Sequence, residues 1–352
     1  MPLLSKEERR NSIALPQIGK IDCVNQCYGE SAKIRGNNKI ISGACIKCKN
    51  PTCIRLQEAS VICPGFDDFS YERNDNVCPV NAISWDSSKE MPVIDKVKCI
   101  NCGLCSLMCP MGAIYSDGHS VYVAEANDDY DIVMADSDGF RKQDELISKL
   151  FELKWKHKFL LESPSVLTYL YDRIDRFDGR SMSANLLVRN IMIVLGYHCS
   201  ISRMGDVYTR IDAVYSNGKK SDGCYGAIEI EFGKDTLDAS RGILDDIAVL
   251  HSRSGIDKNK NTAIVVCLSF PNKRQGYLQV IKDINNVLGL KIQTISLGAL
   301  LILAWNGADV DFLQKDFYVD FDSLSIRENI QNKINRELEL PEGFLGVLEP
   351  EK

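Results

Sequence analysis

The chain has 352 residues, of which 45% are hydrophobic and 26% charged, and its formal net charge is −6. This length allows two or three domains with cores of their own, and the composition is that of an ordinary soluble protein. The most apolar segment, residues 297–305, is less than half of the roughly 20 residues that a membrane-spanning helix needs. No apolar run follows the early charged residues, so we expect a cytoplasmic protein without a membrane partner. The negative charge weighs against non-specific binding to nucleic acid, but it leaves room for a local basic face.

The cysteines crowd into the first third of the chain. Of the 14 cysteines, eleven lie between Cys23 and Cys109. In a cytoplasmic protein such crowding favours metal or cluster ligation over disulfides. We interpret the three later cysteines as small core residues: Cys199, Cys224 and Cys267.

Residues 99–110 read CINCGLCSLMCP, so gaps of two, two and three residues separate four cysteines before a proline. Gaps of this length let three thiolates converge on one cluster, and in bacterial ferredoxins the fourth cysteine of the run binds the other cluster. A partner half lies upstream, because CPVNAI at 78–83 repeats CPMGAI at 109–114 and CIKCKNPTC at 45–53 adds three thiols. Residues 40–125 therefore resemble the two-cluster 4Fe–4S ferredoxin domain.

This resemblance implies two 4Fe–4S clusters with four thiolate ligands each. One cluster would take Cys78, Cys99, Cys102 and Cys105, and the other would take Cys45, Cys48, Cys53 and Cys109. The first half departs from the family pattern, since four residues rather than two separate Cys48 from Cys53, and some twenty extra residues follow Cys53. Cys63 could therefore replace Cys53, and Cys23 and Cys27 have no assignment. Zinc ribbons built from the paired cysteines are a competing interpretation.

An acidic linker is predicted at 126–140, because residues 125–138 hold six acids in fourteen positions and show no helical apolar face. The linker divides the chain into two larger parts with shorter ends. We expect an N-terminal extension, the ferredoxin-like domain, the linker, a second domain, and a C-terminal helix and tail at residues 1–39, 40–125, 126–140, 141–320 and 321–352.

The second domain alternates between helix-like and strand-like patterns. Helices are expected at residues 144–153, 163–177, 183–196, 238–253 and about 274–288, the second with Ser163 as N-cap and Pro164 at its first position. Strands are expected at 198–204, 208–216, 226–233, 261–270 and 291–297, followed by an apolar helical turn. The predicted fold class is α+β and multidomain, with a C-terminal α/β core in which helices flank a mixed sheet.

One of these strands, GAIEIEFG at 226–233, carries two glutamates among apolar residues. Because side chains alternate along a strand, Glu229 and Glu231 point to one face and Ile228 and Ile230 to the other. Burying two carboxylates side by side is costly unless a cation or a proton meets them. A purely structural alternative is that both glutamates line a solvated edge strand.

With Asp212 on the preceding strand and the order helix, three strands, helix, strand, residues 180–270 resemble the PD-(D/E)xK nuclease superfamily, which has a restriction-endonuclease-like core. The resemblance implies that Asp212 and Glu229 bind Mg²⁺ or Mn²⁺. Glu231 stands where the family usually has lysine, an acidic variant that occurs in some of its restriction enzymes, and would be a further metal ligand or would order the attacking water. Ile211 replaces the proline of the family name, and Lys234 could act as a cationic helper.

Together these features predict a Mg²⁺-dependent endonuclease that hydrolyses DNA phosphodiester bonds, with Asp212, Glu229 and Glu231 as catalytic residues. Its clusters would be structural, DNA-reading or redox-sensing, and the fold class suggests restriction or phage defence by analogy. The expected partner is double-stranded DNA. Lysine and arginine clusters could contact its phosphates, at Lys154, Lys156, Lys158, Lys219, Lys220, Lys258, Lys260, Lys273 and Arg274.

Two alternatives belong to other functional classes. One is a ferredoxin-type electron-transfer protein, which leaves the carboxylates without a role. The other is a nucleic-acid-binding module with an inactive nuclease fold. At the C-terminus, residues 325–338 show a capping box from Ser325 to Glu328 and one apolar face, which predicts a packing helix that could also form a homodimer contact.

Overall fold

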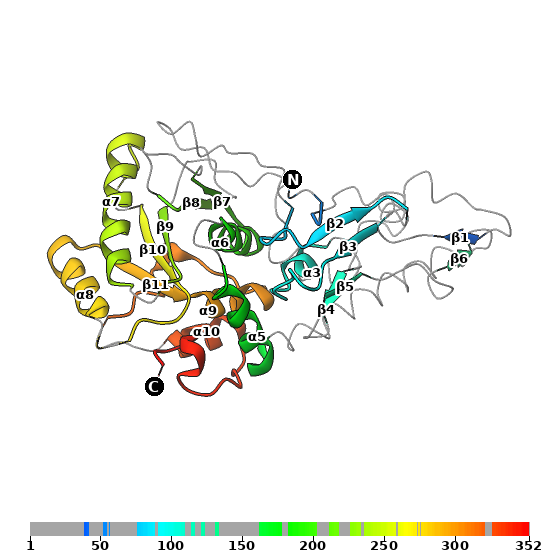
Figure 1. Cartoon of the computed structure of the whole chain (residues 1–352). Helices are drawn as coiled ribbons and strands as arrows, with labels where there is room; N and C mark the ends of the chain where they lie inside the picture. Colours follow the sequence, from blue (N-terminus) through cyan, green and yellow to red (C-terminus); the bar gives the residue numbers. More distant parts are fainter. Residues whose placement is uncertain are drawn as a thin grey trace. The chain divides into compact units, whose positions relative to one another are not determined.

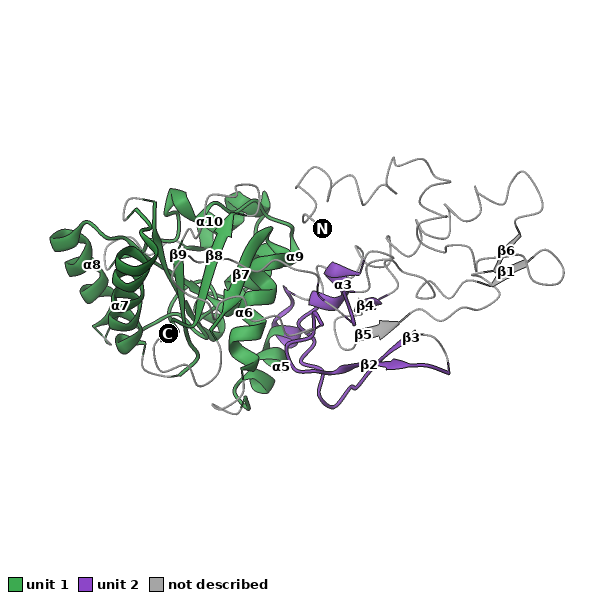
Figure 2. Ribbon diagram, turned by 90° about the horizontal axis from the view of Figure 1, so that it is seen from above, with its two compact units in different colours: residues 1–3, 58–73, 167–352 green, residues 4–57, 74–166 purple. Residues whose placement is uncertain are grey.

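The structure, a computed structural model, forms two compact units, which Figure 2 colours separately. We call residues 4–57 and 74–166 the cysteine unit, and residues 1–3, 58–73 and 167–352 the sheet unit. The structure describes residues 39–41, 52–54, 56, 76–88, 91–109, 114–116, 121–123, 131–133, 162–177, 182–202, 211–217, 226–233, 236–257, 260–272, 274, 276–320 and 326–351.

In its described residues, the cysteine unit consists of short two-stranded sheets, the short helix α3 (Leu104–Met108) and the start of α5 (Pro164–Ile174). The antiparallel pairs are β2 (Ile83–Asp86) with β3 (Met91–Ile94), β4 (Ile114–Ser116) with β5 (Val121–Val123), and β1 (Lys39–Ile41) with β6 (Asp131–Val133). Each of the two repeated CP segments ends on the first residue of a hairpin, at Ile83 and at Ile114, and both isoleucines are buried. Both repeats thus lead directly into a hairpin. β6 lies inside the segment predicted as a linker, whose other residues fall outside those described.

The sheet unit contains a five-stranded mixed sheet in the order β11-β10-β9-β8-β7 (Figure 1). The antiparallel part consists of β7 (Tyr197–Ile201), β8 (Ala213–Asn217) and β9 (Gly226–Glu231). The strands β10 (Thr262–Cys267) and β11 (Ile292–Ser296) then continue parallel to β9. All residues of these two parallel strands are buried, as expected for strands covered on both faces. The predicted mixed sheet is confirmed.

Helices cover both faces of this sheet (Figure 1). On one face, α7 (Leu237–Ser254) and α8 (Tyr277–Leu288) form a core with residues of four strands that includes Val214, Ala227 and Val265. The other face is covered by α6 (Ser183–Val194) and α9 (Leu297–Trp305). The remaining helical elements are α3 (Leu104–Met108), α5 (Pro164–Ile174), α10 (Ile326–Ile334), η6 (Phe312–Gln314) and η7 (Phe344–Gly346).

Local signals in the sequence explain several helix ends. Ser163 caps α5, because its hydroxyl accepts the N–H of Val166 at 3.4 Å, and Pro164 is the first helical residue, as predicted. After α6 the chain leaves the helix at Gly196, whose φ of 97° only glycine adopts readily. The predicted helix at 144–153 lies outside the described residues.

Two expectations about the C-terminal region need correction. The apolar segment after β11 is a complete nine-residue helix, α9, with every residue buried, and not a single turn. The helix α10 ends at Ile334, before Leu338, although Leu338 is itself buried. α10 packs on α9 within the sheet unit. None of the described helices is long and apolar enough to cross a membrane.

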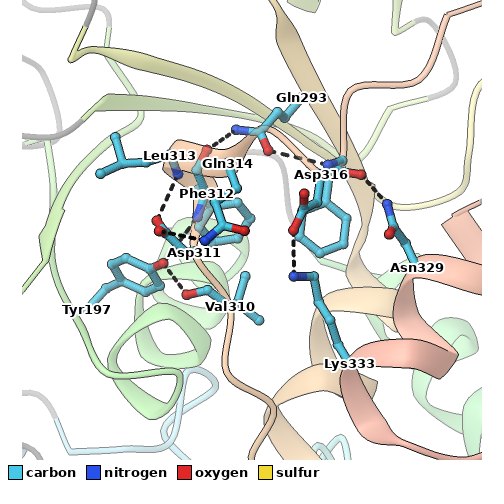
Figure 3. A network of polar contacts seen from close by, with 11 residues as sticks. Tyr197, Gln293, Val310, Asp311, Phe312, Leu313, Gln314, Asp316, Asn329 and Lys333 are labelled. Atoms are coloured by element: carbon cyan, nitrogen blue, oxygen red, sulfur yellow. Dashed lines mark hydrogen bonds and ion pairs between the residues drawn. The ribbon is translucent and has the colours of Figure 1, made fainter.

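The segment from Val310 to Phe317 is tied to the sheet and to α10 by the polar network shown in Figure 3. Gln293 on β11 donates to the carbonyl of Phe312 at 2.8 Å, and Lys333 on α10 pairs with Asp316 at 2.6 Å. Aromatic rings pack beneath it, with Phe312 between Tyr197 and Phe317. The network thus ties this segment to both edge strands of the sheet, β7 and β11. β9 is the central strand.

Candidate functional site

Four cysteines of the cysteine unit line one small cavity. They are Cys78, Cys99, Cys102 and Cys105, the set that the ferredoxin resemblance assigned to one cluster. Apolar side chains such as Ile83, Ile94 and Ile100 complete the lining. The cavity therefore presents four thiol groups surrounded by apolar side chains.

The backbone around these cysteines bends so that N–H groups meet sulfur. Asn101 and Gly103 adopt left-handed conformations with φ of 58° and 73°. The N–H of Ala82 donates to Sγ of Cys78 at 3.2 Å, and that of Asn101 donates to Sγ of Cys99 at 3.4 Å. Such donors stabilise thiolate sulfur, and they tune clusters in iron–sulfur proteins.

Burial raises the pKa of Cys78, Cys102 and Cys105, and for the last two the neighbouring cysteines raise it further. Several buried thiolates are unfavourable together unless positive charge lies among them. Iron bound by thiolates supplies that charge. The residues present therefore fit a 4Fe–4S cluster.

The ligand set predicted for the other cluster is only partly described. Thr52 links the two halves of the repeat, because its hydroxyl donates to the carbonyl of Met108 and its carbonyl accepts the N–H of Val77, both at 2.9 Å. Cys53 directly follows Thr52, and Cys109 directly follows Met108. The Thr52–Met108 hydrogen bond therefore joins the residues that precede these two cysteines. The other cysteines that bear on this set lie outside the described residues: Cys23, Cys27, Cys45, Cys48 and Cys63.

In the sheet unit, Asp212 and Glu229 lie where the pairing of β8 with β9 stops. The last pair of that ladder is Ala213 with Ile228. The sequence predicted Asp212 on the strand, but β8 begins at Ala213, so Asp212 lies one residue before it. Oδ2 of Asp212 accepts the N–H of Ile230 at 2.9 Å, and its Oδ1 accepts from the Asn185 amide at 3.2 Å. By the alternation of strand side chains, Asp212 and Glu229 share the face that α7 covers.

A third acid, Asp246 on α7, meets Glu229 in a hydrogen bond between the two side chains. Asp246 is only 3% exposed. One turn earlier, Gly242 gives the helix room to approach, since a Cβ there would lie 2.7 Å from Oε1 of Glu229. The sheet and α7 thus enclose two carboxyl groups at hydrogen-bonding distance.

Burial, followed by the mutual repulsion of these acids, raises the pKa of Glu229 and Asp246 well above the usual range. Burial raises the pKa of Asp212 as well, while its bonds to Ile230 and Asn185 oppose that rise. No ion pair formed between described residues includes any of the three. Among the described residues, the cluster therefore has no cation to balance its carboxylates.

Glu231, the third predicted catalytic residue, is half-buried at the end of β9 and turns back on its own chain. Its Oε1 accepts the N–H of Gly233 at 2.6 Å. Lys234 lies outside the described residues. In the described part of the chain, no group of three or more His, Cys, Asp or Glu side chains is arranged to hold a single metal ion, and this includes the carboxyl groups of the sheet unit. A divalent cation would therefore require the carboxyl groups to reorient.

Sequence reasoning missed Asp246 and Asn185. A signal for the first was available, because Asp246 falls on the apolar face of α7 with Ile243 and Leu250, at helical spacings of three and four. Asn185, in the first turn of α6, carried no comparable signal. Of the predicted basic clusters, only Lys260 and Arg274 are described, and both are exposed.

Comparisons with known proteins point to the cysteine region. The family described as "4Fe-4S dicluster domain" matches residues 75–123. Over 99 residues the chain is 32% identical to the uncharacterized ferredoxin MJ0155 of Methanocaldococcus jannaschii, which covers 27% of this chain and 48% of that protein. Over 82 residues it is 26% identical to the uncharacterized ferredoxin-like protein YdhY of Escherichia coli K12, covering 23% of this chain and 29% of that one.

The chain thus spans about half or less of the length of these curated relatives. No solved structure matches it. The family match begins just before Cys78 and ends after Cys109, so it takes in the four-cysteine cavity, and it favours iron–sulfur clusters over zinc. The chain is an iron–sulfur protein that contains a 4Fe–4S dicluster ferredoxin domain at residues 75–123.

Proposed function

We propose that this iron–sulfur protein is also a metal-dependent endonuclease that hydrolyses the phosphodiester bonds of double-stranded DNA. The observation that carries the proposal is the pair Asp212 and Glu229, which share one face of the sheet where β8 and β9 part. Both carboxyl groups have a raised pKa from burial, and no cation is paired with either among the described residues. The element order α6, β7, β8, β9, α7, β10 supports the restriction-endonuclease-like assignment.

Asp212 and Glu229 would hold Mg²⁺ or Mn²⁺, since hard divalent cations take carboxylate oxygens together with water and phosphate oxygens. When bound, such an ion polarises the scissile phosphate and lowers the pKa of a water molecule. Asn185 orients Asp212 through Oδ1, and the N–H of Ile230 fixes Oδ2. Glu231, at the exposed end of β9, would release its bond to Gly233 and order the attacking water.

In the cysteine unit, we assign Cys78, Cys99, Cys102 and Cys105 to one cluster, and Cys45, Cys48, Cys53 and Cys109 to the other. The shared cavity supports the first set. The clusters would stabilise a unit that consists of short hairpins, in addition to any role in reading DNA or sensing redox state. A cytoplasmic location, a role in defence and a homodimer all stay predictions. α10 buries Ile326 and Ile330 within its own chain.

Electron transfer is the second candidate, because the relatives carry ferredoxin names. In that case the cysteine unit would pass electrons and the sheet unit would dock a partner. This candidate leaves the buried carboxylates of the sheet unit without a role. A nuclease fold that binds DNA without cleaving it would differ from both in showing affinity but no metal-dependent reaction.

The test is to incubate the anaerobically purified full-length protein with linear, circular and single-stranded DNA, with Mg²⁺, with Mn²⁺ and without divalent cations. The proposal expects cleavage only with a divalent cation. Reversible reduction of the clusters without any cleavage would select electron transfer, and DNA binding without cleavage would select the binding module.

A further inference from the structure

Asp246 is the most deeply buried acid of the sheet unit's carboxylate cluster. It is 3% exposed, it hydrogen-bonds to Glu229, and its Oδ2 has no hydrogen-bond partner among the described residues. An ionised oxygen without a partner in such a position is strongly unfavourable. A residue that served only to pack α7 on the sheet would be apolar, as its neighbours Ile243, Ile247 and Leu250 are.

The backbone around Asp246 makes room for Glu229. Gly242 precedes Asp246 by four residues, so the two lie on the same side of α7, one turn apart. An added Cβ at Gly242 would meet all three carboxyl atoms of Glu229, at 2.7, 3.0 and 3.2 Å. Glu229 therefore lies between Gly242 and Asp246, against the surface of the helix.

We propose that Asp246 is a third carboxylate ligand of the divalent cation bound by Asp212 and Glu229. This inference rests on the metal site of the proposed nuclease and extends it to α7. Once their carboxyl groups reorient, three carboxylates from the residue before β8, the middle of β9 and the middle of α7 would surround one ion. The ion would replace the Glu229–Asp246 hydrogen bond as the link between these two groups, and Oδ2 of Asp246 would gain a partner.

The test is a Mn²⁺ titration of the full-length, cluster-containing protein, followed by the electron paramagnetic resonance signal of free Mn²⁺. Asp246→Asn should weaken Mn²⁺ binding by about tenfold or more, because it keeps the shape of the side chain but removes a charged ligand. Asp245→Asn is the matched control, since Asp245 is the neighbouring acid on the same helix but is exposed. It should bind Mn²⁺ within about twofold of the parent.

Each outcome bears on the inference. Equal Mn²⁺ affinity in Asp246→Asn and the parent would overturn it, as would a parent that binds no Mn²⁺. Without divalent cations, thermal unfolding of Asp246→Asn should occur at or above the parent's midpoint, because one repelling carboxylate is gone. Asp246→Ser, smaller and also neutral, should show the same loss of affinity and provides the measurement if the asparagine variant folds poorly.

The same titration separates this inference from the proposed function. If the parent binds Mn²⁺, Asp246→Asn does not, and neither protein cleaves DNA, the three-carboxylate site stands and the nuclease proposal fails. If the parent cleaves DNA with Mn²⁺ and Asp246→Asn binds the ion equally well, the nuclease proposal stands and the third ligand is wrong.

Discussion

Asp212 accepts, through its side chain, the N–H of Ile230 that a strand carbonyl would otherwise accept. The ladder between β8 and β9 can therefore end without leaving a half-buried donor unsatisfied. Ending the ladder there also brings Asp212 level with Glu229. A single aspartate thus both finishes a strand pair and contributes a carboxylate to the cluster.

The stability of the sheet unit should depend on pH through Glu229. Burial first, and then Asp212 and Asp246, raise the pKa of Glu229 from 4.5 to about 9. Because the folded state holds this proton more tightly than the unfolded chain does, the resulting stabilisation is complete below the unfolded pKa and is lost as pH rises through the folded pKa. Between pH 5 and about 9, the unfolding midpoint of protein free of divalent cations should fall.

Glu229→Gln should flatten this pH dependence, because the amide does not titrate. Thermal unfolding of both proteins across the pH range measures the difference. Glu231→Gln is the control, since Glu231 bonds only to its own turn at the end of β9, and it should keep the slope of the parent. Identical slopes for the parent and Glu229→Gln would show that Glu229 is not buried against its acidic neighbours.

How far the sequence predicted these residues follows from the geometry of each element. Asp212 and Glu229 could be found because a hairpin makes neighbours of residues that are close in sequence, and strand alternation fixes their face. Asp246 meets them because α7 packs across the sheet, and sequence spacing does not predict that contact. The only sign of it in the sequence is an acid on the apolar face of α7. Glu231 was placed correctly on the strand, but its bond to Gly233 is a local detail that alternation does not predict.

At the scale of elements, the close approach of α7 to β9 depends on Gly242. Replacing it with alanine should favour the helix by about 1 kcal/mol, but the new Cβ would lie 2.7 Å from Oε1 of Glu229. The end of a glutamate side chain can move aside, so we expect an unfolding midpoint close to that of the parent. DNA cleavage should nevertheless fall about tenfold or more, because a displaced carboxylate is a poorer ligand.

Unfolding and cleavage rates measured on the same preparation of Gly242→Ala separate these two effects. Ala248→Gly makes the reverse change on the exposed side of α7. It should lower the unfolding midpoint and leave cleavage unchanged. If Gly242→Ala cleaves DNA at the parent's rate, the helix does not constrain Glu229.

The element order was largely predictable, and the exceptions have physical causes. Alternating strands and capped helices identified α5 to α8 and the five strands, and the crossovers through α7 and α8 allow β9, β10 and β11 to run parallel. α9 was underestimated because LGALLILAW is apolar on every side and so shows no helical period. α10 was expected to be too long because Leu338 keeps its apolar spacing after the helix has ended at Ile334.

The whole molecule combines a unit with buried cysteines and a unit with buried carboxyl groups. The ferredoxin run was recognisable because its ligands are local in sequence, whereas the upstream half has a long insertion that spacing alone does not resolve. Purified protein should be brown, with about eight iron and eight labile sulfide per chain. Cys102→Ser should lose one cluster preferentially, and iron and sulfide analysis measures that loss.

The same analysis tests the ligands of the other cluster. Cys53→Ser should lose that cluster and Cys63→Ser should retain it, because Cys53 follows Thr52, which bonds to the Met108 carbonyl just before Cys109. The reverse result would assign Cys63 as the ligand. Stoichiometric zinc without sulfide would contradict the cluster assignment as a whole.

If the sheet unit is a metal-dependent nuclease, the rate of DNA cleavage with Mg²⁺ should fall sharply in Glu229→Gln. The amide preserves shape and most hydrogen bonding but removes a charge that the ion needs. We expect the rate to fall by at least ~10²-fold while DNA affinity stays close to that of the parent. Asp212→Asn should behave alike, and Glu231→Gln should be milder. If Glu229→Gln cleaves DNA as fast as the parent, Glu229 does not bind the catalytic ion and the nuclease assignment of this strand is wrong.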